Sequence, residues 1–120
     1  MVEHTGTKYP LSSVLPHISS EVDRRLPRVD FDGDPIRVSS LRMVTFKVKG
    51  TDCVRCGKKG AYFRKTRSST DVPWHFNLYA ADGTLMTKDH IIPKSKGGKD
   101  FLHNMQTMCT HCNRAKGSGK

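Results

Sequence analysis

Two cysteine pairs constrain the fold of this chain more than any other feature of its sequence. Cys53 and Cys56 form the first pair and Cys109 and Cys112 the second, with 52 residues (57–108) between the pairs. Two C-x-x-C pairs that converge from distant parts of a chain build a tetrahedral thiolate site, the usual arrangement for structural zinc. Gly57 follows the first pair, where the chain must turn tightly so that backbone amides can face the sulfurs. The sequence therefore predicts a structural zinc site with four cysteine ligands.

Disulfide bonds and a redox pair are the alternatives to zinc. Two disulfides would suit a small secreted protein. The N-terminus has no basic segment followed by an apolar stretch, so we expect no secretory signal and a reducing compartment. A redox C-x-x-C motif would need one pair in a thioredoxin-like context, whereas this chain has two pairs. Both comparisons favour zinc.

The composition indicates one small domain with a polyanionic partner. Only 35% of the 120 residues are hydrophobic, so we expect a small core that gains folding free energy from a bound metal. The chain has 21 Lys and Arg against 11 Asp and Glu, a formal net charge of +10. This balance favours nucleic acid, because each neutralised phosphate releases counterions; a basic soluble protein without that role is the alternative. No apolar run approaches the roughly 20 residues of a membrane span, so we expect a cytoplasmic protein without a membrane partner.

In the first half of the chain, residues 16–26 are predicted to form a helix. Pro16 suits a first turn, and apolar residues recur every four positions after it. Residues 1–15 carry few apolar side chains, and we expect them to be ordered only on contact with the rest. Residues 28–35 are predicted to be a loop, in which Asp32-Gly33-Asp34 suits a solvated turn better than a cation site.

The next segments read mostly as strands. Residues 39–49 fit either a helix capped by a serine or an alternating strand, and periodicity alone does not decide between them. Residues 61–66 and 74–79 are predicted strands, and Ala81-Asp82-Gly83 is a turn that leads into a hairpin strand over 85–91. The side chains expected in the core are Trp74, Phe76, Leu78, Tyr79, Met43, Met86, Met105 and Met108.

A histidine stands beside a carboxylate at Asp89-His90. A histidine that takes a proton near neutral pH, next to a carboxylate that can hold a divalent cation, is the minimum for metal-assisted phosphodiester hydrolysis. Adjacent residues of a strand point to opposite faces, so the two side chains can flank one phosphate. A surface salt contact is the alternative. His103 and His111 are weaker candidates for the base, because His103 should be exposed and His111 lies within a cysteine pair.

Further residues of the same region carry a resemblance. The pattern is Asp89-His90-Ile91-Ile92-Pro93, then Gly97-Gly98, Asn104, Cys109, Cys112-Asn113 and Lys116. It resembles the HNH endonuclease family, whose catalytic unit is a ββα-metal fold. The resemblance covers about residues 51–116 and implies an α+β fold: an N-terminal extension with one or two short helices (1–50), a zinc-stabilised nuclease domain (51–117) and a basic tail (118–120). Families of this kind often place a helix before the first cysteine pair, which favours a helix over residues 39–49.

The resemblance also implies roles for individual residues. His90 matches the general base, and Asp89 matches the carboxylate that ligates a catalytic divalent ion. Asn104 matches the asparagine that positions the loop and orients the histidine ring. Asn113 stands where many members have a final histidine and is expected to ligate the ion through its amide oxygen. An oxygen ligand favours a hard cation, Mg²⁺ (or Mn²⁺). Zinc would fix the start of the helix that carries Asn113.

The implied function is cleavage of DNA, expected to be double-stranded, by a metal-dependent endonuclease of a bacterial or phage-infected cell. Phosphate contacts are expected from Arg114 and Lys116 on the last helix and from Lys94, Lys96 and Lys99 in the loop. The alternative is a zinc-stabilised nucleic-acid-binding module without cleavage activity. The sequence leaves open the recognition sequence, nicking versus double-strand cleavage, DNA versus RNA, and the oligomeric state.

Overall fold

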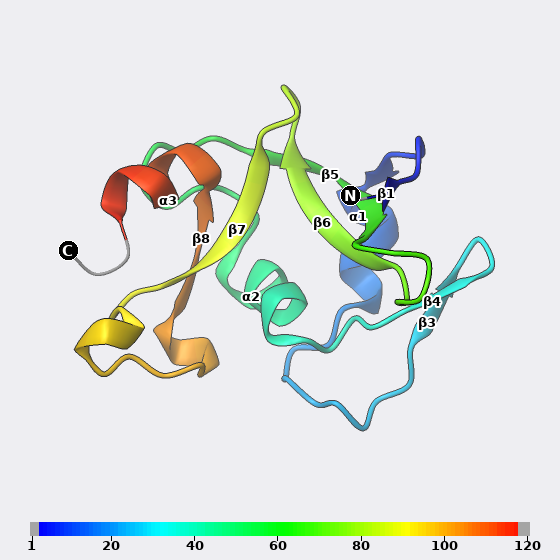
Figure 1. Cartoon of the computed structure of the whole chain (residues 1–120), viewed down its shortest axis with the longest axis horizontal. Coiled ribbons are helices and arrows are strands. Elements are labelled where there is room, and N and C mark those ends of the chain that lie inside the picture. The colour runs from blue at the N-terminus through cyan, green and yellow to red at the C-terminus, as the bar shows by residue number, and fades with distance from the viewer. Residues whose placement is uncertain (1–2, 118–120) are drawn as a thin grey trace.

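An antiparallel sheet organises the fold, with strands in the order β1-β5-β6-β7-β8 and β2 also paired to β5 (Figure 1). The computed structural model describes residues 3–117, and the predicted tail at 118–120 lies outside the described residues. In chain order the elements are β1 (Glu3–His4), β2 (Tyr9–Pro10), α1 (Leu11–Val14), the 3₁₀ helix η1 (Leu15–His17), β3 (Val29–Phe31), β4 (Asp34–Ile36), α2 (Leu41–Lys49), β5 (Gly60–Arg67), β6 (His75–Ala80), β7 (Leu85–His90), the 3₁₀ helices η2 (Lys94–Lys96) and η3 (Leu102–Asn104), β8 (Met105–Cys109) and α3 (Thr110–Lys116).

One hydrophobic core joins the N-terminal 50 residues to the rest of the chain. Phe31 of β3 meets Phe76 of β6 edge to face at 4.9 Å between ring centroids, and Tyr9 of β2 meets the same ring at 5.3 Å. Of the side chains expected in the core, all are buried except Trp74, which is half-buried and packs against it. The first 50 residues therefore share the core of the sheet, and the short helices expected there are accompanied by strands β1 to β4.

The predicted helix over residues 16–26 is wrong. The helical residues lie earlier, in α1 and η1, and residues 18–26 are irregular. Two side chains explain the difference, because the Ser19 hydroxyl accepts from the backbone N–H of Glu21 and the Asp23 carboxylate accepts from that of Arg25. Such local bonds compete with the helical ladder. The backbone N–H groups of Ser19 and Asp23 instead donate to the carbonyls of residues 38 and 39.

The prediction of a loop over residues 28–35 is also wrong, because the strands β3 and β4 form a hairpin there. Asp32 and Gly33 form its turn with φ of +53° and +91°, the left-handed conformation that tight hairpins favour. This turn was expected to be solvated, but side chains of the large sheet form hydrogen bonds with it. The buried Lys65 ammonium of β5 donates to the carbonyl of Phe31 at 2.5 Å and to Asp34 at 2.8 Å, and the Tyr9 hydroxyl donates to Asp32.

Residues 41–49 form the helix α2, within the segment 39–49 for which the resemblance predicted a helix. The Ser40 hydroxyl caps α2 by accepting from the backbone N–H of Met43 at 3.3 Å. The predicted strands over 61–66, 74–79 and 85–91 are confirmed as β5, β6 and β7, and Gly83 (φ +87°) closes the turn between β6 and β7. Within residues 3–117, no helix has the length and apolar character needed to cross a membrane.

The C-terminal part has the expected ββα arrangement and confirms the α+β fold class. Strands β7 and β8 are antiparallel from Met86↔Cys109 to His90↔Met105, and a loop over residues 91–104 connects them. Helix α3 begins directly after β8 and contacts both strands (Figure 1). It runs back along β7, so that Asn113 reaches Thr87 and Lys116 reaches Asp89. The helix therefore lies beside the strand end that carries Asp89 and His90.

Candidate active site and metal centre

A cleft of ≈ 460 Å³ lies between the end of β7, the following loop and α3. Six of the site residues predicted from the sequence line it: Asp89, His90, Lys94, Asn113, Arg114 and Lys116. Lys88, which the sequence analysis did not single out, lines it as well. Asn104, Lys96 and Lys99 are not among its lining residues. The structure thus brings the predicted base and both predicted ion ligands to one cleft.

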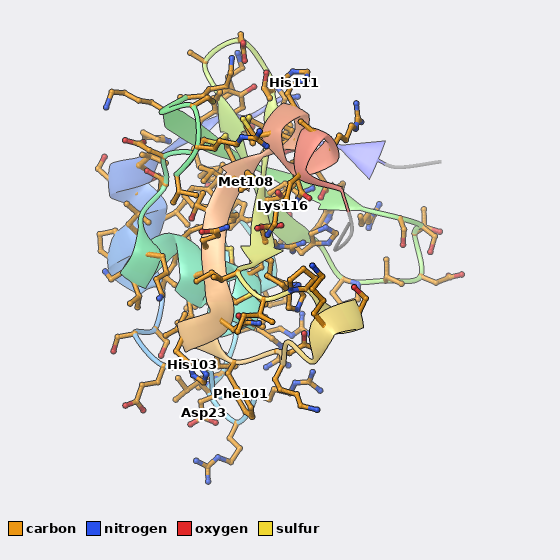
Figure 2. All side chains as sticks on the ribbon, turned by 90° about the vertical axis from the view of Figure 1, so that its left-hand side faces the viewer. Asp23, Phe101, His103, Met108, His111 and Lys116 are labelled. Atoms are coloured by element: carbon orange, nitrogen blue, oxygen red, sulfur yellow. The ribbon has the colours of Figure 1, made fainter. Side chains whose placement is uncertain are left out.

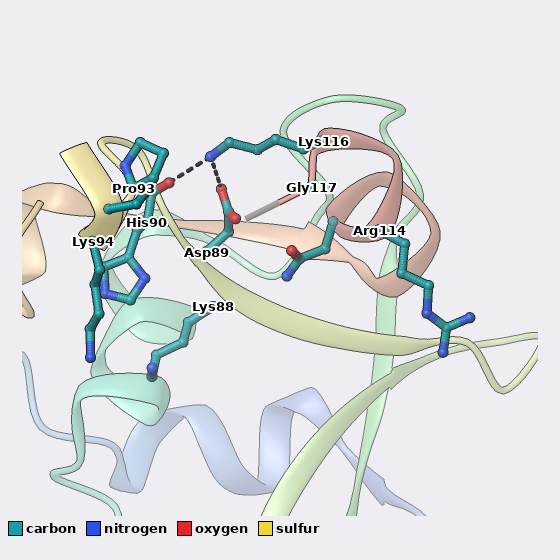
Figure 3. A pocket seen from close by; sticks show the side chains of 10 residues that line it. Lys88, Asp89, His90, Pro93, Lys94, Arg114, Lys116 and Gly117 are labelled. Atoms are coloured by element: carbon teal, nitrogen blue, oxygen red, sulfur yellow. Dashed lines mark hydrogen bonds and ion pairs between the residues drawn. The ribbon is translucent and has the colours of Figure 1, made fainter. Parts of the chain in front are cut away.

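Asp89 is buried, with 7% of its surface exposed, and the two side chains bonded to its carboxylate come from β8 and α3. Its carboxylate accepts from Gln106 at 2.9 Å and from the Lys116 ammonium at 2.7 Å. The same ammonium donates to the backbone carbonyl of His90 at 2.6 Å (Figure 3). Lys116 was expected to hold phosphate, but in this structure its charge is paired with the carboxylate that was expected to hold the catalytic ion.

The His90 imidazole points away from Asp89, toward Lys94 and Lys88 (Figure 3). Its Nε2 lies 2.6 Å from a carboxylate oxygen of Asp100, and the other oxygen of that carboxylate lies 3.3 Å from the Lys94 ammonium. The hydrogen bond with His90, and then the bond and charge of Lys94, lower the pKa of Asp100 below its usual value. Sequence reasoning missed Asp100. One signal was available, because Asp100 is the only acidic residue after Asp89.

Asn104 is buried and closes the loop that follows β7. Its amide oxygen accepts from the backbone N–H of Ile92 at 2.9 Å, and its amide nitrogen donates to the carbonyls of Ile92 at 3.1 Å and Lys99 at 3.0 Å. These bonds join both ends of the loop. Its contacts are thus with the loop backbone, while the His90 ring is bonded to Asp100.

Asn113 faces the cleft from α3. Its amide nitrogen donates to the Thr87 hydroxyl at 2.9 Å, and that hydroxyl donates to the carbonyl of Met108 at 2.7 Å. These two hydrogen bonds fix the orientation of the Asn113 amide. The Thr87 hydroxyl donates its proton to Met108, so it can only accept from the amide nitrogen of Asn113. With the nitrogen used inside the protein, the carbonyl oxygen is the atom that Asn113 offers to a ligand in the cleft.

The alternative histidines lie outside the cleft. Figure 2 shows His111 on one side of Lys116 and His103 far on the other. Both are exposed, and the His103 ring stacks on Phe101 at 5.6 Å between centroids. Of the remaining basic residues, Lys94, Lys96, Lys99 and Arg114 are exposed around the site, and Lys94 also pairs with Asp100.

The two cysteine pairs converge at the start of α3. Their four sulfurs lie within 4.8 Å of one another, and none of the four is in a disulfide. Gly57, with φ +80°, turns the chain after the first pair, and its N–H donates to the carbonyl of Cys53 at 3.0 Å. Four clustered thiols fit a tetrahedral metal site. The predicted convergence of the pairs is therefore confirmed, and the cluster could hold a metal such as zinc.

The thiols of this cluster differ in acidity. Burial acts to raise the pKa of Cys53, but hydrogen bonds from the backbone of Cys56, Cys109 and Arg55 lower it to about 6. Burial and hydrogen bonds with the other thiols raise the pKa of Cys112 to about 12. Without a cation, the cluster thus favours a thiolate at Cys53 and a neutral thiol at Cys112. A bound metal ion would stabilise further thiolates, because metal ligation deprotonates the coordinating thiol.

Comparison with protein families gives a match in the second half of the chain. Residues 73–119 match the family model described as HNH endonuclease. The matched segment covers less than half of the chain and contains β6, β7, β8, α3 and the second cysteine pair, whereas the first pair precedes it. No curated protein and no solved structure matches the chain.

Proposed function

We propose that this protein is a metal-dependent endonuclease that hydrolyses phosphodiester bonds of double-stranded DNA, since its residues 73–119 match the HNH endonuclease family model. The observation that carries the proposal is the cleft itself, which Asp89, His90 and Asn113 line together. The net charge of +10 supports a nucleic acid as the substrate.

His90 is the proposed general base. A neutral imidazole at the cleft accepts the proton of a water molecule as that water attacks phosphorus. Asp89 and Asn113 are the proposed ligands of a catalytic Mg²⁺ or Mn²⁺, since a carboxylate and an amide oxygen are the hard donors that these ions prefer. When bound, such an ion stabilises negative charge on the leaving oxygen. Asn104 holds the loop after β7 in place and so contributes to the site through the backbone.

Zinc is the metal that we propose for the four cysteines. Thiolate ligands from two distant segments suit it, and the site would fix the start of α3 relative to β5. Free thiols at a structural site are typical of a reducing compartment, so we propose that the protein acts in the cytoplasm of a bacterial or phage-infected cell. Metal analysis of the purified protein should find about one zinc per chain.

Phosphate binding is proposed for the exposed cations around the cleft, which are Lys94, Lys96, Lys99 and Arg114. Among them, Lys94 pairs with the exposed Asp100. Lys116 differs from these cations, because its ammonium is bonded to the buried Asp89 and to the backbone of β7. This ion pair is also the observation that favours the alternative function. A nucleic-acid-binding module without cleavage activity needs no metal at Asp89. In such a protein Lys116 would remain the partner that neutralises the Asp89 carboxylate.

A plasmid-nicking assay with Mg²⁺ separates the two functions. His90→Ala should lower the cleavage rate about 10²- to 10⁴-fold, the usual contribution of a general base. His103→Ala is the matched control, since His103 is exposed and outside the cleft, and it should cleave like the wild type. The endonuclease proposal fails if His90→Ala cleaves as fast as the wild type. It also fails if the wild type binds DNA but cleaves none with any divalent ion.

A further inference from the structure

We propose that Asp100 is a positioning residue for His90, holding its Nε2–H so that Nδ1 is the nitrogen that takes the proton. This inference rests on the proposed function of His90 and adds a residue to it. A surface ion pair without a catalytic role is the opposing view of the same contact, because the Asp100 side chain is 55% exposed.

The contact determines which ring nitrogen is available. His90 Nε2 and the Asp100 carboxylate oxygen are 2.6 Å apart. An ionised carboxylate only accepts hydrogen bonds, so Nε2 must carry the hydrogen. In a neutral imidazole the lone pair is then on Nδ1, and this nitrogen is the proton acceptor. After the transfer, the carboxylate also stabilises the imidazolium that forms, as in other carboxylate–histidine pairs.

Hydrogen bonds within the loop after β7 set its path and place Asp100 next to His90. Asn104 holds the carbonyl of Lys99, the residue before Asp100, at 3.0 Å. Gly98 donates to the carbonyl of Pro93 at 2.9 Å, and a Cβ at Gly98 would lie 1.7 Å from the carbonyl oxygen of Ile92. Only glycine fits this close approach, so the loop folds back over its own start and returns to the end of β7.

Lys94 holds the carboxylate from the other side. Its ammonium lies 3.3 Å from the second oxygen of Asp100, which leaves the first oxygen to His90. Hydrogen bonds and charge from these two partners keep the pKa of Asp100 below its usual value, so the carboxylate is ionised at neutral pH. The loop thus supplies an anion with two fixed contacts, one of which is the proposed base.

A double-mutant cycle in the nicking assay tests the functional part. Asp100→Asn should lower kcat about 10- to 100-fold, part of the effect of a general base, without weakening DNA binding. In a His90→Ala background the same change should have no further effect, because Asp100 acts only through His90. Asp71→Asn is the matched control on a remote exposed turn. The proposal is overturned if Asp100→Asn leaves kcat unchanged, or if it lowers the rate equally with and without His90.

Nuclear magnetic resonance of the ¹⁵N-labelled protein tests the contact without any cleavage. A neutral His90 ring held by Asp100 should show hydrogen on Nε2, a bare Nδ1, and an Nε2 proton that is downfield and protected from exchange. Asp100→Ala should abolish that protection. A wild-type ring with its hydrogen on Nδ1, or an unprotected Nε2 proton, overturns the proposal. The spectrum tests the contact between Asp100 and His90 independently of the endonuclease function. If the protein cleaves no DNA, the proposed function fails, and the position of the ring hydrogen still shows whether Asp100 holds Nε2–H.

Discussion

The ion pair between Lys116 and Asp89 is the residue-scale feature that bears most directly on metal use. Asp89 is buried beneath α3, and its carboxylate is bonded to one ammonium and one amide. A divalent ion that binds this carboxylate must displace the ammonium or share the oxygen atoms with it. Lys116 therefore acts as a competitor of the metal in the proposed enzyme, and its release on metal binding would free a cation for the phosphate.

Lys116→Met tests this competition. Methionine keeps an unbranched stem and removes the charge, so Mn²⁺ affinity at the cleft should rise about tenfold, close to the worth of one charge-assisted hydrogen bond. Isothermal titration with Mn²⁺ measures it. Arg114→Met is the matched control, because Arg114 lines the same cleft but is exposed, and it should leave the affinity nearly unchanged. An unchanged or weaker affinity in Lys116→Met would show that Lys116 does not compete with the ion.

The sequence predicted Asp89 and His90 as site residues but not Asp100, and the difference has a physical reason. Asp89 and His90 are adjacent, so one strand end brings both to the cleft and their proximity could be read directly. Asp100 is ten positions further along the chain from His90, and its contact depends on the path of the loop. That path is set by Gly98 and the Asn104 amide, which periodicity does not report.

At the scale of elements, α3 depends on the cysteine cluster. The helix has seven residues, fewer than an isolated helix needs to be stable in water. No residue of α3 is buried, so core packing contributes little to its position. It is held instead by Cys112 within the cluster and by the polar contacts of Asn113 and Lys116 with β7. A metal in the cluster would thus fix the element that carries one proposed ligand of the catalytic ion.

Loss of that metal should therefore release α3 before it unfolds the sheet. Cys56→Ser, or a chelator added to the wild type, should raise amide hydrogen exchange over residues 110–117 and abolish cleavage, while the paired strands β5 and β6 stay protected. His111→Ala is the control, since it alters the same cysteine pair without removing a sulfur. Equal loss of protection in α3 and in β5 would instead mean that the cluster supports the whole fold.

The elements that the sequence predicted well and poorly differ in what decides them. Strands β5 to β7 follow hydrophobic patterns that agree with burial in the core. The pattern over helix α2 does not decide between helix and strand, but the resemblance favours the helix, which begins at a serine cap. Residues 18–26 have helical spacing, yet Val22 and Leu26 are 43% and 42% exposed. The side chains of Ser19 and Asp23 bond the backbone N–H groups of the residues two positions further on, in place of a helical ladder. The β3–β4 hairpin could have been recognised from Asp32-Gly33, whereas its attachment through Lys65 is a tertiary contact.

At the scale of the whole molecule, the N-terminal residues form part of the surface around the site. A second cleft, of ≈ 530 Å³, lies beside the first and is lined by Arg24, Arg37, the start of α2, Lys88 and Asp100. Lys88 of β7 lines both clefts. Arg37 also donates to the backbone carbonyl of Arg24 at 2.9 Å, which holds the Arg37 guanidinium beside the backbone of residue 24. Basic side chains thus continue from the proposed active site to Arg24 and Arg37, and we expect the DNA backbone to follow them across Lys88.

This path is tested by the salt dependence of DNA binding. Each phosphate contact contributes about 0.9 to the slope of log K against log salt on duplex DNA, so Lys88→Gln should reduce the slope by about that amount for DNA of any sequence. Lys59→Gln is the control, because it makes the same change in net charge at a lysine that lines neither cleft and is paired with Asp52. Binding isotherms without Mg²⁺, measured at several salt concentrations, give both slopes. Equal slopes for the two variants would mean that only the net charge of the molecule attracts DNA, and that the surface across Lys88 is not its path.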